Sequence, residues 1–540
     1  MVKQQVRGVS LLIAVLLVLG IVGRFTNLAH KLYWHDEVYT TFRAAGYFAE
    51  EILDRAFQGE ILPASELQTF QQLKPDSTVV DTLQSLALED PQHPPLYFLL
   101  ARGWMQLFGN TIVIARILPA LLSLLSLPLM YQWAKSVFQT TSAAWWSTVM
   151  LALSPFDILY AQAARQYSLL TVCAIASHWR FMRALQYPTW VNWGLYTVVS
   201  TLGLYTHPLF ALVPIAHGAY GAIAWVFNQW PSPDFPRASR RSSGLKRVVS
   251  LFAAFGLMGL LYSPWIWVIR SNNQTFQLAT GWTQQSIPLL ELIKLWIRNF
   301  GALWIDFDFD LTAAEIGIVG LGLKLLALLV LPLALWYLWQ HLPRSQALYL
   351  ITIIFVPFLL LAIPDVTTGG VRSVIGRYVL PIMPGLQLAV GGWLSRQIQP
   401  EKRLWRIGLP LLLTGSIASN VISLPAETWW NKEPSFYNAA VAKQINSVDQ
   451  PLVVSDQGSA YTNFGNLLSL SYRLDEDVQL LLRWQSTDFA VLETWPSDRP
   501  AFAYKPSAEL VAYLEDAGWQ LTPAPLNGQP VGDELFELNQ

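Results

Sequence analysis

The chain has 540 residues, of which 53% are hydrophobic and only 13% are charged, and its formal net charge at pH 7 is −1. Soluble domains carry about 25% charged residues, so this composition excludes a soluble globular enzyme and predicts an α-helical polytopic membrane protein. The net charge says nothing about nucleic acid, because basic residues in such a protein mainly report loop orientation, and we expect no nucleic-acid partner. A single cysteine, Cys173, excludes an intrachain disulfide and a zinc site built of thiolates.

The N-terminal apolar run from Val9 to Ile21 follows Lys3 and Arg7 and has no small-residue cleavage site behind it, which predicts an uncleaved first span. Each span needs about 20 apolar residues. On that basis we predict about eleven spans. They lie at 9–27, 111–133, 143–161, 166–185, 192–207, 209–228, 248–269, 314–339, 346–363, 376–395 and 405–424.

The basic residues predict the orientation of these spans. With a cytoplasmic N-terminus, every predicted cytoplasmic loop is basic, and the loop at 229–247 is the most basic of them. Its basic residues are Arg237, Arg240, Arg241, Lys246 and Arg247. The external segments are then 28–110, 162–165, 270–313, 364–375 and everything after about 425. This orientation predicts a multi-pass protein of the cell (inner) membrane with a periplasmic C-terminus.

Three apolar stretches in the external segments predict interfacial helices. Val38, Phe42, Ala45, Ala49 and Ile52 recur every three to four residues, as on an amphipathic helix at a membrane surface. The stretch at 93–109 resembles a span, but counting it as one would put the basic cluster at 229–247 outside. The stretch at 287–305 is interrupted by charged residues.

After Leu424 the composition becomes that of a soluble domain. It predicts a helix at 436–445, strands at 451–455 and 488–492, and a helix at 507–517 that ends at Gly518. This alternation predicts a small external α/β domain at 425–540. The membrane domain would be residues 1–424, with 28–110 as its first external loop.

Asp36 and Glu37 are the first candidate catalytic residues, because they leave the membrane directly after the first span. Charge at that depth is costly unless it is solvated or functional. On one helix their side chains point about 100° apart, so only one of them can face a given substrate. Asp36 is the better placed. The simpler alternative is that Asp36 caps the helix.

Other candidates gather at the predicted external ends of spans. Arg165 and Tyr167 follow the third span, and a glycine-containing loop carries Arg372, Arg377 and Tyr378. Guanidinium groups there fit a phosphate, although Arg165 alone would equally contact lipid headgroups. His93 and His207, each before a proline, would hydrogen-bond a phosphate or an acceptor hydroxyl, or serve only the fold.

The order of several short motifs resembles the GT-C superfamily of polytopic glycosyltransferases. The similarity is greatest to bacterial members related to protein O-mannosyltransferase and to the lipid A aminoarabinose transferase. The motifs are Trp34-His35-Asp36-Glu37, His93-Pro94-Pro95-Leu96-Tyr97, Leu107-Phe108-Gly109, Ser154-Pro155, Tyr160 to Tyr167, Tyr205-Thr206-His207 and Arg377 to Pro381. The resemblance covers roughly residues 1–395.

The resemblance implies an inverting transferase that takes a sugar from a polyprenyl-phosphate donor outside the cytoplasm, with Asp36 as general base. The donor phosphate would bind His93, Arg165, Tyr167, Arg372, Arg377 and Tyr378. His35 and His207 are the candidates for contacts to the acceptor or the sugar. The acceptor would be a glycan, a lipid or a protein.

Two points stay open in the sequence. Many GT-C members carry Glu where this chain has Ala163, so a divalent metal, Mg²⁺ or Mn²⁺, is neither required nor excluded by the resemblance. The alternatives to an enzyme are a transporter or flippase of lipid-linked saccharides and a non-catalytic membrane scaffold. The spans lack the charged mid-span residues and paired broken helices of many transporters.

Overall fold

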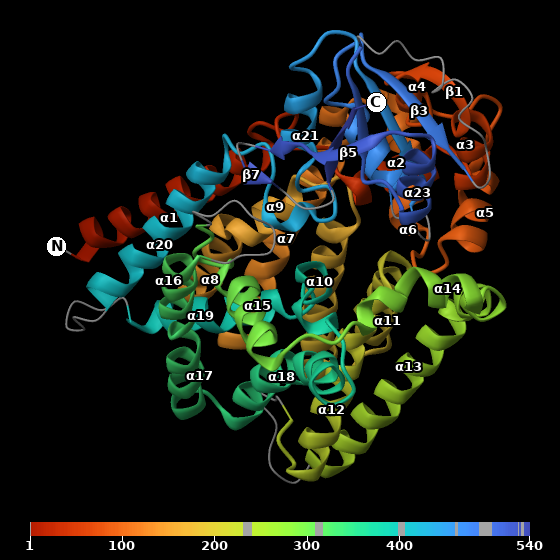
Figure 1. The fold of residues 1–540 in the computed structure, drawn as a ribbon. Coiled ribbons are helices and arrows are strands. Elements are labelled where there is room, and N and C mark those ends of the chain that lie inside the picture. Colours follow the sequence, from red (N-terminus) through yellow and green to blue (C-terminus); the bar gives the residue numbers. More distant parts are fainter. Residues whose placement is uncertain are drawn as a thin grey trace. The chain divides into compact units, whose positions relative to one another are not determined.

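The structure is a computed structural model that describes residues 2–230, 240–307, 317–397, 405–458, 463–484, 499–526, 529–530 and 534–539. The described chain forms two compact units (Figure 1). The membrane unit comprises Met1–Thr26, Asp90–Tyr97 and Arg116–Pro425, and the α/β unit comprises Asn27–Glu89, Phe98–Ala115 and Ala426–Gln540. The strand predicted at 488–492 and Arg237 of the basic cluster lie outside the described residues.

The membrane unit is helical throughout its described parts. Its α-helices are α1 (Val2–Phe25), α7 (Ile112–Phe138, whose first turn belongs to the other unit), α8 (Thr141–Leu153), α9 (Pro155–Ala161), α10 (Tyr167–Gln186), α11 (Trp190–Thr206), α12 (Leu212–Val226), α13 (Arg240–Ser271), α14 (Asn273–Thr280), α15 (Leu289–Gly301), α16 (Ile318–Leu328), α17 (Val330–His341), α18 (Arg344–Thr367), α19 (Met383–Gln397) and α20 (Trp405–Ser423). Short 3₁₀ turns are η1 (Pro208–Ala211), η3 (Gly281–Gln284), η4 (Arg372–Val374) and η5 (Gly376–Tyr378).

Six helical segments in the described chain are long and apolar enough to cross a membrane. They are Gly8–Phe25, Ile112–Phe138, Pro208–Val226, Gly244–Ser271, Ile318–His341 and Arg344–Thr367. Other predicted spans are shorter or interrupted: the one at 143–161 is divided at Ser154, whose hydroxyl accepts from the Asp157 N–H and caps α9. The total of eleven therefore stays a prediction. At 13 residues each, α15 and α6 (Leu96–Phe108) are too short to span alone.

Small residues bring the central helices of the membrane unit into close contact. A Cβ added to Gly391 of α19 would collide with the backbone of Ser147 on α8, and one added to Gly20 of α1 would collide with Ala152. The Arg24 guanidinium donates to the Ala152 carbonyl at 2.6 Å. Close backbone approach at small residues is how apolar helices associate in a bilayer, where no hydrophobic force drives them together.

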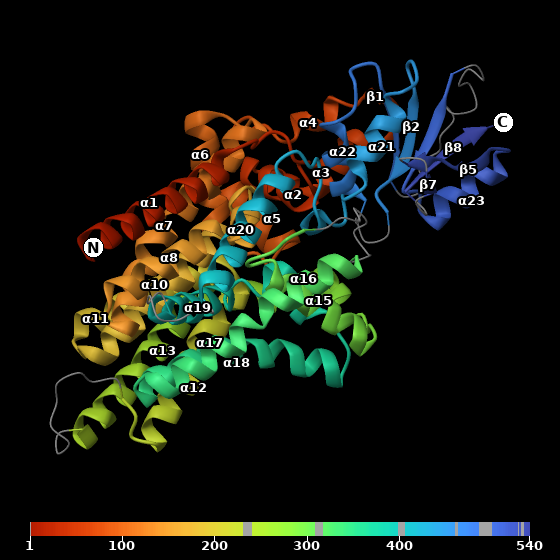
Figure 2. The same ribbon diagram turned by 90° about the vertical axis from the view of Figure 1, so that its left-hand side faces the viewer.

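The α/β unit contains a mixed six-stranded sheet in the order β1-β3-β2-β4-β8-β5. Central β2 (Leu452–Asp456) is parallel to β3 (Gln479–Arg483) and β4 (Ala501–Tyr504), whereas β8 (Leu535–Asn539) and β5 (Gln520–Pro523) are antiparallel additions. The short strands β6 (Pro525–Leu526) and β7 (Gln529–Pro530) pair separately. Helices α22 (Phe464–Ser471) and α23 (Ala508–Asp516) follow β2 and β4 and lie on opposite faces of the sheet (Figure 2).

Edge strand β1 (Gln58–Pro63) comes from the segment after α1 and pairs antiparallel with β3, with Ile61 opposite Leu481. The helices α2 (His35–Ala45), α3 (Ala49–Ala56), α4 (Glu66–Thr69), α5 (Val79–Glu89) and α6 belong to the same unit, with α21 (Asn438–Ile445) from the C-terminal part. The structure thus divides the chain differently from the predicted boundaries of 1–424 and 425–540. Most of the loop at 28–110 folds with the C-terminal residues.

The C-terminal elements agree well with the sequence, since α21, β2 and α23 lie within two residues of their predicted positions and Gly518 is left-handed with φ +88°. The single helix expected over 38–52 is instead two helices, because Gly46 adopts φ +95° and ends α2. Most of α2 is buried, including the charged residues Glu37 and Arg43. Helix α2 is therefore a core element of the α/β unit.

Candidate functional site

Asp36 lies in the first turn of α2, which begins at His35. The N-cap residue is Trp34, with no capping side-chain hydrogen bond, so Asp36 is not the N-cap residue. Its carboxylate is half-buried, and the positive end of the helix dipole favours a negative charge in this turn. The backbone carbonyl of Asp36 accepts from the Thr40 hydroxyl at 3.0 Å. Placement at the helix start keeps Asp36 as the candidate base.

Glu37 has different surroundings from its neighbour. It is fully buried, and its Oε2 lies 3.0 Å from Nζ of Lys432, which is 1% exposed. The same ammonium group stands 5.5 Å from the centre of the Trp34 ring. A buried carboxylate with a matched buried cation is a structural ion pair. This geometry is that of a buried ion pair, and the catalytic role considered for Glu37 from the sequence stays a prediction.

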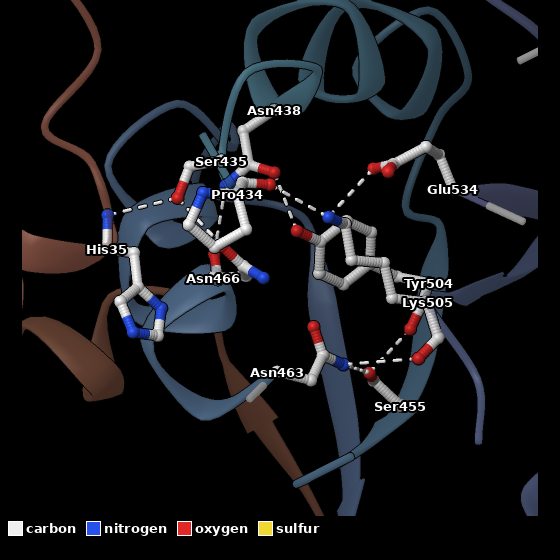
Figure 3. A network of polar contacts seen from close by, with 10 residues as sticks. All are labelled: His35, Pro434, Ser435, Asn438, Ser455, Asn463, Asn466, Tyr504, Lys505 and Glu534. Carbon is white, nitrogen blue, oxygen red and sulfur yellow. Dashed lines mark hydrogen bonds and ion pairs between the residues drawn. The ribbon is translucent and has the colours of Figure 1, made fainter. Parts of the chain in front are cut away.

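His35 joins the start of α2 to the C-terminal part of the same unit. Its backbone N–H donates to Oγ of Ser435 at 3.0 Å (Figure 3). Its ring packs on Tyr39 with centroids 4.7 Å apart and contacts Gly465 of α22, where an added Cβ would collide with both rings. The predicted role of His35 in acceptor or sugar binding stays a prediction.

In the membrane unit, His93 and Arg165 are in direct contact. Arg165 Nη2 donates to His93 Nε2 at 3.0 Å, which places the imidazole proton on Nδ1. That Nδ1 lies 3.0 Å from Oδ1 of Asp90. Arg165 is 3% exposed and Asp90 6%. The Asp90 carboxylate, the His93 imidazole and the Arg165 guanidinium group therefore form one row. His93 and Arg165 are 72 residues apart in the sequence.

Aromatic and imidazole rings continue this row. The His207 ring lies 6.5 Å from that of His93 and 6.3 Å from that of Tyr378. His207 Nδ1 accepts from the backbone N–H of Leu209 at 3.1 Å, so its ring proton is on Nε2. The Arg377 guanidinium stands over both Tyr378, at 5.7 Å, and Trp282, at 5.5 Å. These are cation–π distances.

We call this group the imidazole–arginine cluster. It consists of Asp90, His93, Arg165, His207, Trp282, Arg377 and Tyr378. Tyr167 borders it, buried at 1% exposure, with the Arg165 guanidinium 5.8 Å from its ring. The cluster has two guanidinium groups and one carboxylate, so it suits an anionic ligand.

Arg372 differs from the other predicted phosphate ligands. Its Nη1 donates to Oδ1 of Asp365 at 3.2 Å, and the buried Asp365 carboxylate also accepts from the Ser373 N–H at 2.6 Å. Ser373 in turn accepts from the Trp296 indole N–H at 2.9 Å. In this arrangement Arg372 holds the turn η4 to the end of α18.

Among the described residues, no group of three or more His, Cys, Asp or Glu side chains could hold a metal ion. Burial, and then the Glu534 charge, raise the pKa of Tyr504 well above its usual value, so this phenol is a neutral hydrogen-bond donor to Asn438 at 2.6 Å.

Sequence reasoning missed four residues that matter here: Asp90, Trp282, Lys432 and Ser435. Asp90 precedes His93 by three residues, a spacing that would have supported a carboxylate–imidazole pair. Trp282 lies in a segment recognised only as external. The sequence around Lys432 and Ser435 does not indicate that they contact α2, because their partners on that helix are about 400 residues away.

Residues 92–232, which include four of the predicted site residues, match the model of the dolichyl-phosphate-mannose-protein mannosyltransferase family. No curated protein matches the chain significantly by sequence. The structure is similar to that of ArnT from Cupriavidus metallidurans bound to undecaprenyl phosphate, with 14% identity over 98% of this chain and 97% of ArnT and a TM-score of 0.53. The structure of apo ArnT from the same organism is similar too, with 13% identity over 99% of this chain and 98% of ArnT and a TM-score of 0.54.

The resemblance to the GT-C superfamily is confirmed. The ArnT likeness extends along nearly the whole chain and shows the GT-C fold, whereas the family match covers the segment that carries His93, Arg165, Tyr167 and His207. Together they show a GT-C fold and, over residues 92–232, a match to the mannosyltransferase family model.

Proposed function

We propose that this GT-C protein transfers a sugar from a polyprenyl-phosphate donor to an acceptor hydroxyl, with inversion at the anomeric carbon. The observation that carries the proposal is the imidazole–arginine cluster, which offers an anion two guanidinium groups, imidazoles and a phenol within one membrane unit. The likeness to a structure solved with undecaprenyl phosphate supports a lipid-phosphate ligand of this class.

The cluster would stabilise the leaving group. A lipid phosphate leaves as an anion that needs no proton, so catalysis requires positive charge and hydrogen-bond donors where negative charge develops. Arg165 brings a guanidinium group to this place, and the ring proton of His207 is on Nε2. Tyr378 adds a hydroxyl, and Arg377 a second guanidinium group. We assign the donor phosphate to these four residues, with Tyr167 beside them.

Asp36 would be the general base. The acceptor oxygen forms a bond to the anomeric carbon while the bond from that carbon to the phosphate oxygen breaks. The bonding pair leaves with the phosphate, and the hydroxyl proton passes to the Asp36 carboxylate. The sugar thereby inverts its configuration. Glu37, sealed with Lys432, takes no part in the proton transfer.

The proposed orientation follows the sequence. A cytoplasmic N-terminus would put the imidazole–arginine cluster and the α/β unit on the external side of the cell membrane, where a polyprenyl-linked sugar is used. The acceptor supplies a hydroxyl group, on a glycan, a lipid or a protein. A reporter fused at Asn110 tests the orientation, since an external segment 28–110 requires that it be external.

Replacing Asp36 by Asn tests the function. Full-length protein in lipid vesicles is given synthetic polyprenyl-phosphate mannose and a native membrane extract as the acceptor source, and the released polyprenyl phosphate is measured by mass spectrometry. Removing the base should slow release about a thousandfold. The matched control is Asp54→Asn, an exposed carboxylate in the same unit, which should retain full activity.

Two outcomes would count against the proposal. Normal release by Asp36→Asn would remove the assigned base. Movement of the labelled donor across the vesicle membrane without sugar release, by the wild-type protein, would favour a lipid-linked saccharide transporter instead. Mass spectrometry of the lipid that copurifies with the protein then identifies the donor sugar to be used.

A further inference from the structure

The start of α2 is held by a C-terminal segment of the same unit. Three contacts join residues 427–435 to residues 32–37. The Leu32 N–H donates to the Glu427 carbonyl at 2.7 Å, the His35 N–H donates to the Ser435 hydroxyl at 3.0 Å, and the Lys432 ammonium pairs with Glu37 at 3.0 Å. Asp36 lies between the second and third of these contact points. The segment therefore fixes the backbone on both sides of the proposed base.

Ser435 supplies what α2 lacks at its N-terminus. The first four N–H groups of a helix have no partner within the helix, and a capping side chain normally satisfies one of them. Trp34 occupies the N-cap position without such a bond, and the Ser435 hydroxyl accepts from the first helical residue instead. Ser435 is fully buried. A serine 400 residues away thus performs part of the capping function.

A chain of buried hydrogen bonds then connects Ser435 to the sheet (Figure 3). The Ser435 hydroxyl donates to Oδ1 of Asn466 on α22 at 2.7 Å. Asn438 Nδ2 donates to the Asn466 carbonyl at 3.0 Å, and the Tyr504 hydroxyl donates to Asn438 Oδ1 at 2.6 Å. Tyr504 is the last residue of β4. The first turn of α2 is thereby tied to the carboxyl end of a central strand.

Steric fit supports the same placement. Helix α22 passes the first turn of α2 at Gly465, where a Cβ would collide with the rings of His35 and Tyr39. Lys432 and Glu37 are both fully buried, so their pairing also has a narrow geometric tolerance. Hydrogen bonds, an ion pair and close packing all act on the turn that carries Asp36.

We propose that Lys432, Ser435 and Asn466 are positioning residues for Asp36, so that the C-terminal α/β fold sets where the proposed base stands. This inference rests on the proposed function. A carboxylate displaced by about 1 Å from a reacting hydroxyl loses up to a hundredfold in rate. These three residues would act on the reaction through Asp36 and not by contact with the substrate.

Ser435→Ala is the first test, in the full-length protein in lipid vesicles with the polyprenyl-phosphate mannose assay. It removes one hydroxyl, so the protein should fold. We expect kcat to fall about tenfold, KM for the donor lipid to stay unchanged, and the acid limb of the pH–rate profile to shift. Ser435→Thr keeps the hydroxyl and should restore both. Ser447→Ala, an exposed serine of the same unit, is the control and should change nothing.

The ion pair gives an independent test. Lys432→Met alone would leave Glu37 buried without its partner, so the decisive variant is the neutral pair Glu37→Gln with Lys432→Met. It should fold, yet show a reduced kcat. Lys443→Met removes the ammonium of an exposed ion pair with Glu427 and should leave activity unchanged.

The outcomes separate this inference from the proposed function. If Asp36→Asn is inactive while Ser435→Ala and the neutral pair both keep the wild-type kcat and pH profile, the positioning role is refuted and the base assignment stands. If Ser435→Thr fails to rescue Ser435→Ala, the hydroxyl is not what positions α2. If Asp36→Asn is fully active, the proposed function itself fails.

Discussion

The two units of the protein organise their charged groups in opposite ways. In the membrane unit, the imidazole–arginine cluster gathers residues from the ends of helices, among them the guanidinium groups of Arg165 and Arg377. In the α/β unit, the charges around Asp36 are sealed: Glu37 and Lys432 neutralise one another, each at most 1% exposed. Guanidinium groups suit a site that must receive an anion, whereas a buried ion pair suits a site that must keep a helix in place.

The comparison predicts that the sealed pair matters most for stability. Lys432→Met should destabilise the region around α2 by about 3–5 kcal/mol, because it leaves a buried carboxylate without its cation, whereas Glu37→Gln with Lys432→Met should recover most of that loss. Hydrogen exchange of the α2 and α21 segments, followed by mass spectrometry, measures this opening free energy. Equal exchange in the single and double variants would show that the pair contributes no coupling.

The cluster, in contrast, should matter most for ligand affinity. Arg165→Ala should weaken binding of undecaprenyl phosphate by about 2 kcal/mol, roughly thirtyfold in Kd, because it removes hydrogen bonds to a charged group. Titration of the protein in detergent measures the affinity. Arg183→Ala, at the other end of α10, is the matched control and should bind normally. Equal losses in both variants would mean that Arg165 only attracts lipid headgroups by its charge.

The same contrast explains how much the sequence could predict. The cluster residues stand in recognisable local contexts, as a histidine before a proline or an arginine in an external loop. Each could therefore be predicted from its own stretch of sequence; they are His93, Arg165, His207, Arg377 and Tyr378. The fold class was also predictable, because composition and apolar runs dictate a polytopic helical protein.

What the sequence could not show are pairings set by the tertiary fold. Glu37 and Lys432 are 395 residues apart in the sequence. The segment Gln58–Pro63 has too little β-propensity to predict an edge strand. Such a strand forms because β3 offers it an unpaired edge. The boundary predicted at residue 425 therefore missed the contribution of residues 27–89 to the α/β unit.

The smallest expected effect comes from an exposed ion pair that serves as a reference for the sealed one. The hydrogen bond from Lys443, followed by the Lys443 charge, lowers the pKa of Glu427 below its usual 4.5. Because the folded pKa is depressed, the pair stabilises the fold above about pH 4.5, and this contribution is lost as the pH falls through the lower folded value. The Lys443 side chain is 64% exposed and that of Glu427 is 31% exposed, so Glu427→Gln should cost at most about 1 kcal/mol at pH 7 and less at high salt. Thermal unfolding of the wild type and the variant should differ slightly at pH 7 and converge near pH 3; a difference as large as that for Lys432→Met would show that burial does not distinguish the two pairs.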